Sequence, residues 1–429
     1  MTSITPNSEL HTPNSSTGTP QSAIRNPQSL LSGRRVLFIV ENLPVPFDTR
    51  PWVEAQALKE EGMEVAIICP RGKGYEAPYE FLKGIHIYRH PFPIEAGRAV
   101  EYLLEYGLSL FWEFFYSLKI FRKMRFEVIH VANPPDLLCL IGLAYKWLGV
   151  RFVYDQHDIC PEVMEAKFGK KGILYKALVF WERVSYWAAD LVIATNESYR
   201  DLAIERGQVD PRKVSVVRTG PDLSRIPSEV KRDDSLKKGK RFMVGYVGVI
   251  EKQEGLDYLV QVVKEIVQGF RRQDILFMIV GGGTQVPFIQ ELVKKEGLED
   301  FFHFTGRVSD EILFNCLGNC DVCVNPDLFN EASNRSTMRK IMEYMALGKA
   351  IVQTEVIEGR YTAQEASLYA RPDDQKDFAE KILYLLDHPE EAKRRGLIGK
   401  KRIHESLHWG VQKQNLITAY ENLFNNLMV

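Results

Sequence analysis

The chain contains little cysteine, little net charge and no long hydrophobic run. Six scattered cysteines among 429 residues do not suit a disulfide-stabilised secreted scaffold, so we expect a reducing, cytoplasmic location. Lys and Arg number 55 and Asp and Glu 56, and this near-neutral balance argues against nucleic acid as a partner. The longest apolar stretch, residues 107–121, is interrupted by Glu113 and Lys119. It is shorter than the ~20 residues of a membrane-spanning helix, so we predict no transmembrane segment.

The first 33 residues differ in composition from the rest of the chain. They are rich in Ser, Thr, Pro and Asn and carry only Glu9 and Arg25 as formal charges. They lack the basic start and apolar core of a signal peptide. Because such a segment buries too little apolar surface to fold, we predict a disordered tail over residues 1–33.

After the tail, short apolar runs alternate with helical patterns. The first series has predicted strands at 35–40, 63–69, 127–133, 151–156, 191–195 and 214–218, and predicted helices at 51–61, 99–123, 136–147 and 173–189. The second has predicted strands at 243–248, 275–281, 301–306, 321–326, 350–355 and 367–371, and predicted helices near 255–269, 285–296, 310–318, 337–347 and 375–387. Repeated alternation of strand and helix predicts parallel sheets with helices on both faces.

A charged stretch with few apolar residues, 228–240, separates the two series and is predicted to be a linker. The fold class is therefore α/β, with two doubly wound Rossmann-like domains over residues 34–227 and 241–405 that face each other across a cleft. The remaining segment, 406–429, includes a helix at about 410–427. Its Leu416, Tyr420 and Phe424 form one apolar stripe, which we expect to pack back on the N-terminal domain.

The segment YDQHDICPE, residues 154–162, begins inside a predicted strand and runs past its end. In a doubly wound sheet this junction opens into the ligand crevice. A strand that ends in polar residues gives up apolar burial for chemistry, and histidine donates hydrogen bonds or moves protons near neutral pH. We predict that His157 and Asp158 are catalytic. The alternative is that His157 caps the next helix and Asp158 holds it.

Two glycine-rich turns follow strands of the second domain. One is VGYVGVIEKQEGLD, residues 244–257, where Gly248 and its neighbours permit close approach of a diphosphate. The other is IVGGGTQ, residues 279–285, whose three glycines could cradle phosphate. Either turn could equally serve packing alone. Neither matches the G-x-G-x-x-G fingerprint of a nicotinamide cofactor.

Residues 325–352 are interpreted as a strand end, a polar loop and a helix that starts near Thr337. Ser336 or Thr337 could cap this helix, and the free amides of its first turn favour an anion. Lys340 and Glu343 lie on one helix face at i, i+3. We interpret the cluster as a binding site, and the alternative is a surface salt bridge on a core helix.

Cys316, Cys320 and Cys323 have a C-x3-C-x2-C spacing that some iron–sulfur proteins use. The pattern runs from a predicted helix end into a strand, so we favour buried free cysteines and predict no metal site.

The helix predicted at 99–123 is rich in aromatic residues and is followed by basic ones. Such a pattern can dock on an anionic membrane surface, so residues 99–125 are a candidate for peripheral membrane contact. The alternative is a packed helix whose basic end complements its dipole.

Together these features resemble glycosyltransferase family 4, of the GT-B fold. The resemblance covers most of the chain after residue 34. Five segments carry it, namely VENLPVPFDTRPWVEAQAL, ANPPDLL, YDQHDICPE, STMRKIMEYMALGKAIV and EGRYTAQEASLYA. They resemble the members that build bacterial exopolysaccharide, capsule or O-antigen.

The resemblance implies a retaining, hexosyltransferase-type glycosyltransferase. Such an enzyme moves a sugar from a nucleotide diphosphate sugar to a hydroxyl of a lipid-linked or polysaccharide acceptor, with no cofactor and no required metal. The N-terminal domain would serve the acceptor and the C-terminal domain the donor. His157 would lie near the donor sugar and Glu343 at the ribose hydroxyls. The implied donor-binding set is Gly248, Lys252, Arg307, Val308, Thr337, Met338, Arg339, Lys340 and Glu343.

Three positions depart from the family pattern. Arg335 stands where the first Glu of E-x7-E is usual, and Val249 and Glu254 stand where the glycine loop usually has Arg and Lys. The phosphate charge must then be met by other cations, of which Lys252, Arg307, Arg335, Arg339 and Arg360 are the candidates. Two alternative functions follow, a nucleotide-sugar epimerase of the same fold and a non-catalytic partner of an active transferase.

Overall fold

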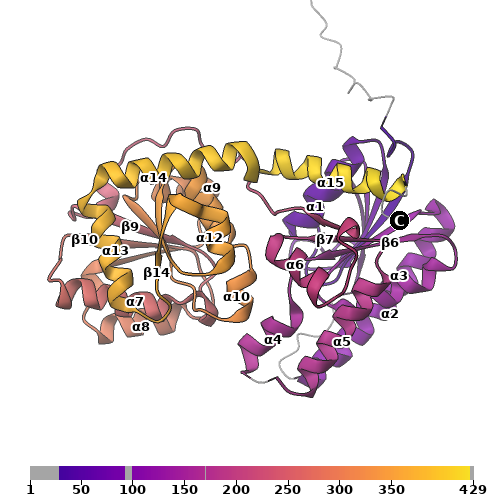
Figure 1. The fold of residues 1–429 in the computed structure, drawn as a ribbon, viewed down its shortest axis with the longest axis horizontal. Helices are drawn as coiled ribbons and strands as arrows, with labels where there is room; N and C mark the ends of the chain where they lie inside the picture. The colour runs from indigo at the N-terminus through magenta and orange to yellow at the C-terminus, as the bar shows by residue number, and fades with distance from the viewer. Residues whose placement is uncertain (1–28, 92–98, 170, 426–429) are drawn as a thin grey trace, which may run out of the picture.

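The structure is a computed structural model, and it describes residues 29–91, 99–169 and 171–425. Two α/β domains lie side by side, and the last helices run along one side of both (Figure 1). Most of the predicted tail lies outside the described residues. Leu31, inside that predicted tail, is fully buried in the N-terminal core, so the folded domain begins before residue 34.

The N-terminal domain is built on an eight-stranded sheet of order β3-β4-β2-β1-β5-β6-β7-β8. Its strands are β1 (Arg35–Val40), β2 (Glu64–Pro70), β3 (Tyr79–Leu82), β4 (Ile85–His90), β5 (Val128–Ala132), β6 (Arg151–Gln156), β7 (Leu191–Ala194) and β8 (Val214–Val216). Its helices are α1 (Thr49–Glu60), α2 (Ala99–Met124), α3 (Cys139–Lys146), α4 (Cys160–Phe168), α5 (Ile173–Ala188) and α6 (Glu197–Glu205).

Both faces of this sheet are buried, and the sequence of β1 shows why. Val36, Phe38 and Val40 belong to one apolar cluster, whereas Leu37 and Ile39 belong to the cluster on the other face. Successive side chains of a strand point to opposite faces, so a continuous apolar run needs cover on both. This confirms the prediction of a parallel sheet between two helical layers.

The exception is a hairpin that sequence patterns did not predict. β3 runs antiparallel to β4, and the two are joined by Lys83 and Gly84, both with positive φ (49° and 79°). Two-residue turns of this kind match the twist of antiparallel strands. The run YEFL carries little apolar signal because β3 is a half-exposed edge strand.

The C-terminal domain has a six-stranded parallel sheet of order β11-β10-β9-β12-β13-β14. Its strands are β9 (Phe242–Val247), β10 (Ile275–Val280), β11 (Phe302–Gly306), β12 (Val322–Asn325), β13 (Ala350–Thr354) and β14 (Ser367–Ala370). Its helices are α7 (Leu256–Lys264), α8 (Val286–Lys295), α9 (Asp310–Gly318), α10 (Glu331–Arg335), α11 (Arg339–Ala346), α12 (Ile357–Ala363), α13 (Gln375–Asp387) and α14 (Pro389–Arg402). Cys316, Cys320 and Cys323 are free, buried and part of one apolar cluster of this domain.

The chain passes between the domains twice, and the two crossings touch. Val217 still packs in the N-terminal core, whereas Leu223 packs on the C-terminal domain, so the expected linker at 228–240 lies against the second domain. At Gly220 a Cβ atom would lie 2.0 Å from the carbonyl oxygen of Leu407, on the returning chain. Only glycine allows this contact between the two crossings.

After the second crossing, α15 (Trp409–Phe424) packs on the N-terminal domain (Figure 1). Leu416, Ile417 and Tyr420 are buried in the same apolar cluster as β1. The predicted apolar stripe therefore covers the first domain, and the folded unit of the N-terminal domain includes the end of the chain.

Candidate active site

In both sheets the strand order reverses next to the first strand of the domain. β1 lies between β2 and β5, and β9 lies between β10 and β12. Ligands of doubly wound folds bind at the carboxyl ends of the strands at such a reversal. A cavity of about 190 Å³ lies there in the N-terminal domain, lined by residues that follow β1, β5 and β6. A larger cavity of about 850 Å³ borders Glu64–Ala66 at the start of β2, at the opposite end of the sheet.

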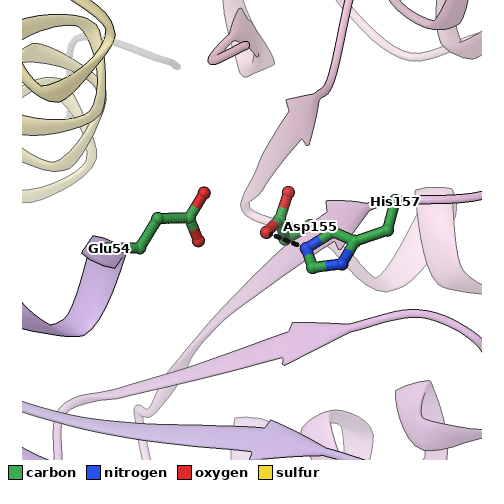
Figure 2. A group of neighbouring side chains, drawn as sticks. All are labelled: Glu54, Asp155 and His157. Atoms are coloured by element: carbon green, nitrogen blue, oxygen red, sulfur yellow. Dashed lines mark hydrogen bonds and ion pairs between the residues drawn. The ribbon is translucent and has the colours of Figure 1, made fainter. Parts of the chain in front are cut away.

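His157 lines the smaller cavity and is held from behind by a buried ion network. Its Nε2 lies 2.6 Å from Oδ2 of Asp155, the last but one residue of β6 (Figure 2). Arg50 of α1 donates to Asp155 Oδ1 at 2.8 Å and pairs with Glu54 at 3.1 Å. Arg50 Nε lies 3.1 Å from the same Nε2, so this ring nitrogen faces both Asp155 and Arg50.

The charges of this network are strongly coupled. Burial alone would raise the pKa of Asp155, but Arg50 and His157 outweigh it and hold that pKa well below its usual range. Burial raises the pKa of Glu54 well above its usual value, although Arg50 opposes the shift. Asp155 is therefore the permanent anion of the network, and His157 is a neighbour of a fixed negative charge.

The C-terminal helix reaches this network from the other side. The hydroxyl of Tyr420 lies 2.7 Å from Nδ1 of His130, whose Nε2 is 3.4 Å from Asp155 Oδ2. Burial lowers the pKa of His130, which favours the neutral ring, and its Nδ1 accepts a hydrogen bond from the Tyr420 hydroxyl. Tyr420 thus orients His130, whose ring lies beside the Asp155 carboxylate, although the two residues are 290 positions apart in the sequence.

Asp158 and the chain around it are fixed by Asn133. The backbone amides of His157 and Asp158 donate to Asn133 Oδ1 at 2.7 Å and 3.1 Å. Asp158 and Asp48 both line the cavity, and burial raises the pKa of each. His157 does not act as a side-chain cap of α4, which begins after Ile159 without a side-chain cap.

The residues of Figure 2 are also the one candidate metal cluster found within the described ranges. Glu54, Asp155 and His157 offer ligand atoms within 4.8 Å of one another (Figure 2). Arg50 already pairs with both carboxylates. A cation would have to compete with this guanidinium, so the donor set is suited to an arginine rather than a metal ion.

Across the cleft, the predicted donor-binding helix starts two residues later than expected. α11 begins at Arg339, after an N-cap Met338 that gives no side-chain hydrogen bond. Thr337 does not cap the helix, because its hydroxyl donates to Glu358 Oε1 at 3.2 Å. The polar loop before it contains a further short helix, α10, capped by Asn330. The amides of Met338, Arg339 and Lys340 precede the first helical hydrogen bond of α11 and can bind an anion.

Lys340 lies inside the domain rather than at the helix surface. Its Nζ is 2.8 Å from Asp327 Oδ1 and 2.5 Å from Glu254 Oε2, and it lies over the ring of Tyr246. Burial would lower the pKa of Lys340, but the attraction of Asp327 and Glu254 outweighs it and raises that pKa. The departure at position 254 is thereby explained, because Glu254 is a counter-ion of Lys340.

Glu343 is half-buried one turn further along α11. Burial raises its pKa, and the nearby charges of Arg339 and Arg225 oppose the shift. The surroundings of this carboxylate suit a partner of either arginine.

The two glycine-rich turns pack on each other. Gly248 donates to Val280 O, and a Cβ atom at Gly281 would lie 2.0 Å from Gly248 O. The triple glycine therefore serves close packing of the two loops, whatever else it binds. Beside them Lys252 and Arg307 are exposed, and Val308 packs on the apolar cluster behind α11. These residues lie in the loops that follow the carboxyl ends of β9, β10 and β11.

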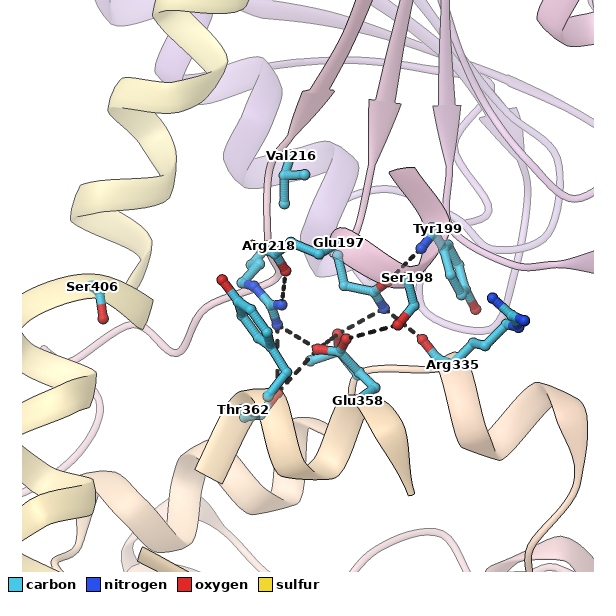
Figure 3. A network of polar contacts seen from close by, with 12 residues as sticks. Glu197, Ser198, Tyr199, Val216, Arg218, Arg335, Glu358, Thr362 and Ser406 are labelled. Carbon is cyan, nitrogen blue, oxygen red and sulfur yellow. Dashed lines mark hydrogen bonds and ion pairs between the residues drawn. The ribbon is translucent and has the colours of Figure 1, made fainter. Parts of the chain in front are cut away.

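The domains meet through a polar network between α6 and the region of α10 to α12 (Figure 3). Buried Arg218 pairs with Glu358 at 2.7 Å and with Glu197. Asn196 Nδ2 donates to Arg335 O at 2.8 Å and to Thr337 Oγ1 at 3.0 Å. The segment that leads into α11 is thus positioned by the N-terminal domain.

One contact brings the two halves of the site together. Arg339 Nη1 of α11 donates to Thr49 Oγ1 at 3.2 Å. Thr49 follows Asp48, which lines the cavity with His157. The amino end of α11 therefore lies beside the cavity that contains His157 and Asp158.

Sequence patterns did not identify several residues of this site. Arg50 and Glu54 are buried on α1. Sequence patterns passed over them because Trp52, Ala55 and Leu58 mark α1 as a helix of the apolar core. The signal that could have revealed Arg50 and Glu54 is a pair of opposite charges at i, i+4 on the buried side of an amphipathic helix. Asn133 and Arg218 had no such local signal, because His157 and Glu358, which they bind, lie 24 and 140 residues away in the sequence. Asp48 had none either, because only the fold places it in the cavity.

Comparison with known families agrees with this architecture. A family model described as Glycosyltransferase Family 4 matches residues 54–225, and one described as Glycosyl transferases group 1 matches residues 241–388. The chain belongs to glycosyltransferase family 4. The resemblance of the sequence to this family is thereby confirmed.

Related proteins extend this result over most of the chain. It is 24% identical to the capsular polysaccharide biosynthesis glycosyltransferase CapM of Staphylococcus aureus over 394 residues, which cover 87% of this chain and 93% of CapM. The sucrose-phosphate synthase of Thermosynechococcus elongatus superposes with a TM-score of 0.75 at 17% identity, covering 92% of this chain and 100% of that one. Anabaena HepE in complex with UDP-glucose gives a TM-score of 0.64 at 14% identity, covering 92% and 99%. These structures confirm the two-domain GT-B fold.

Proposed function

We propose that this glycosyltransferase moves a hexosyl unit from a nucleotide diphosphate sugar to a hydroxyl of a lipid-linked or polysaccharide acceptor, with retention of configuration. The observation that carries the proposal is the contact of Arg339 with Thr49. It sets the anion-binding end of α11 beside the cavity that contains His157 and Asp158. A donor diphosphate at α11 would thus direct its sugar toward that cavity.

Charge development in the reaction fits this arrangement. The leaving diphosphate gains negative charge in the transition state, and helix-end amides and cations that face it stabilise that state. Lys340 is already neutralised by Glu254 and Asp327, so exposed Arg339, Lys252 and Arg307 are left to meet the phosphate charge. We assign Glu343 to the ribose hydroxyls and His157 to the donor sugar. Attack then occurs on the face from which the diphosphate leaves.

The names of related proteins support the substrate classes. HepE has been crystallised with UDP-glucose, which supports a nucleotide-sugar donor here. The capsular role in the name of CapM supports an acceptor of cell-surface glycan synthesis, such as exopolysaccharide or capsule. We accordingly propose that the enzyme acts on the cytoplasmic face of the membrane.

The exposed face of α2 supports peripheral membrane contact. Among the side chains that the structure describes, its inner face carries buried polar Ser109, Glu113 and Ser117 as well as buried Ile120. Its outer face carries exposed Phe111 and Phe115, and the exposed basic residues Lys119, Arg122 and Lys123 follow. Apolar side chains beside cations suit the interface of an anionic membrane. No helix within the described ranges is long and apolar enough to span a bilayer.

Calorimetric titration with UDP, GDP and ADP, first without metal and then with Mg²⁺, tests the donor assignment. We expect metal-independent binding of one nucleotide and at least tenfold weaker binding by Glu343→Ala. Glu380→Ala, an exposed carboxylate of α13, is the matched control. Transfer activity is then measured with the sugar form of that nucleotide. We expect His157→Ala to impair sugar transfer but not nucleotide binding.

The outcomes separate the three candidate functions. Conversion of the nucleotide sugar to its epimer without acceptor would replace the transferase with an epimerase. Failure to bind any nucleotide would favour a non-catalytic partner subunit.

A further inference from the structure

The larger cavity of the N-terminal domain takes no part in the site described above. It is a groove of about 850 Å³ bordered by the β3–β4 hairpin, the start of β2 and the end of α2, and is named here the hairpin groove. We propose that the hairpin groove is a second glycan-binding site, which holds a segment of an acidic polysaccharide on aromatic rings and lysine side chains. The inference goes beyond the proposed function, because the groove shares no lining residue with the cavity at His157.

The floor of the hairpin groove is a continuous aromatic surface. Tyr79 is paired with Tyr88, and Phe81 with His86, so the four rings share one face of the sheet. The ring centroids of Tyr79 and Tyr88 are 5.1 Å apart, and those of Phe81 and His86 are 4.8 Å apart. Tyr79 and Phe81 are 47% and 59% exposed, so α2 leaves this end of the sheet face uncovered.

The charge of the hairpin groove is positive. Three lysines line it, Lys59 at the end of α1 and Lys119 and Lys123 of α2, and Glu64 is the one carboxylate of the lining. Burial lowers the pKa of His86 on the floor, and the charges of Lys59 and Lys123 lower it further. The opposing attraction of Glu64 does not cancel this shift. The positive field therefore reaches the aromatic floor, where it favours an anion.

Aromatic rings beside lysines suit an acidic sugar chain. A pyranose ring has a face of C–H groups, which packs on the face of an aromatic ring. A carboxylate on the same sugar accepts charge-assisted hydrogen bonds from lysine. The volume of about 850 Å³ equals that of about 28 water molecules at liquid density, which is space for several sugar rings.

The hairpin groove lies on a different side of α2 from the face that we assign to the membrane. Tyr116, Ile120 and Lys123 line the groove and follow one another at i, i+4 and i+7. Phe111 and Phe115 are exposed and stand outside the lining. A flat bilayer that contacts this outer face does not enter a groove between the helix and the hairpin. The groove is therefore assigned to a glycan rather than to a lipid head group.

The hairpin groove is also remote from the reaction. The seven residues of β2, at ~3.3 Å each, place the two ends of the sheet roughly 20 Å apart. The groove borders the start of β2, whereas the cavity at His157 lies beyond the carboxyl ends of the strands. A polymer held in the groove does not react there, but its free end stays at high local concentration near the catalytic cavity.

Binding of matched oligosaccharides tests the proposal without nucleotide and without turnover. The probes are tetragalacturonate and tetraglucuronate, each with its neutral methyl ester, titrated by calorimetry at low salt. For at least one acid we expect binding at least tenfold tighter than that of its ester, about 1.4 kcal/mol. Lys59→Gln and Phe81→Ala should each weaken the binding of that acid at least threefold. Neither side chain is fully buried, so both variants should fold.

Lys393→Gln and Phe288→Ala, which change exposed residues of α14 and α8, are the controls and should bind the acid as wild type does. Anionic vesicles of phosphatidylglycerol test the lipid alternative, and Lys59→Gln and Phe81→Ala should sediment with them as wild type does.

Four results would overturn the glycan site. They are equal affinity for acid and ester in both pairs, no binding of either acid, wild-type affinity in either groove variant, and loss of vesicle sedimentation in the groove variants alone. The last result would assign the groove to a lipid head group. None of these measurements involves the nucleotide, so a failure of the proposed function appears separately, in the nucleotide titration.

Discussion

Replacing Lys340 by Met should destabilise the C-terminal domain strongly at neutral pH. Methionine keeps most of the apolar stem of the lysine but removes the ammonium group. That group is 2.8 Å from Asp327 Oδ1 and 2.5 Å from Glu254 Oε2. The variant therefore leaves two carboxylates that face each other without a cation.

The size of the effect follows from burial. The Asp327 side chain is 6% exposed and that of Glu254 22%, so solvent screens the remaining repulsion poorly. Loss of one partner from a buried ion pair typically costs about 3–5 kcal/mol. For a domain of this size a loss of about 3 kcal/mol lowers the unfolding midpoint by roughly 6–12 °C.

The pH dependence of the variant has a defined sign. Burial already raises the pKa of Asp327 in the folded protein, with Lys340 opposing, so removal of Lys340 raises it further. The folded variant then binds a proton that the unfolded chain has released. Its stability is greatest below the unfolded pKa of Asp327 and falls as pH rises through the folded value.

Thermal unfolding at pH 5 and pH 8 measures this, with Lys340→Met/Glu254→Gln as the rescue variant. We expect the single variant to lose more stability than wild type between the two pH values, and the double variant to recover part of the loss. A Lys340→Met midpoint equal to wild type at pH 8, or an unchanged pH profile, would refute the reasoning. If the rescue variant also restores nucleotide affinity, Lys340 serves the fold rather than the donor.

Two further predictions concern other parts of the molecule. Burial raises the pKa of Glu182 to about 7, although the nearby charge of Arg206 opposes the shift. The contribution of protonated Glu182 to stability is therefore present below about pH 4.5 and decreases as the pH rises to 7. Glu182→Gln should remove a pH-dependent loss of up to about 3 kcal/mol between those values, measured by denaturant unfolding, and parallel wild-type and variant profiles would contradict this. Phe111→Ser/Phe115→Ser should reduce sedimentation with anionic vesicles several-fold, whereas Phe288→Ser, an exposed phenylalanine of α8, should not. Equal sedimentation of all three proteins would exclude α2 as the contact.

Several features of the fold were predictable from local sequence. Runs such as VLFIV in β1 and ILFMIV in β10 are apolar at every position, which only a sheet covered on both faces accommodates. Alternation with helical patterns then predicts two parallel sheets. The β3–β4 hairpin escaped prediction because an edge strand is half-exposed and its alternation is short.

The candidate site was predictable only at strand and helix ends. His157 and Asp158 follow a buried strand, and Lys340 and Glu343 share a helix, so local patterns bring them to attention. The pattern could not show that Lys340 points inward. Its partners Glu254 and Asp327 lie 86 and 13 residues away, and both are brought to it by the sheet.

Local periodicity and contiguous motifs were enough to identify the family, the two-domain architecture and the segments that face the cleft. The contacts between distant polar side chains could be seen only in the folded molecule. Arg50 reaches Asp155, Tyr420 reaches His130, and Arg339 reaches Thr49 across sequence separations of 105, 290 and 290 residues. Such polar contacts depend on distance in space, and the order of strands in a sheet, rather than the order of residues in the chain, sets that distance.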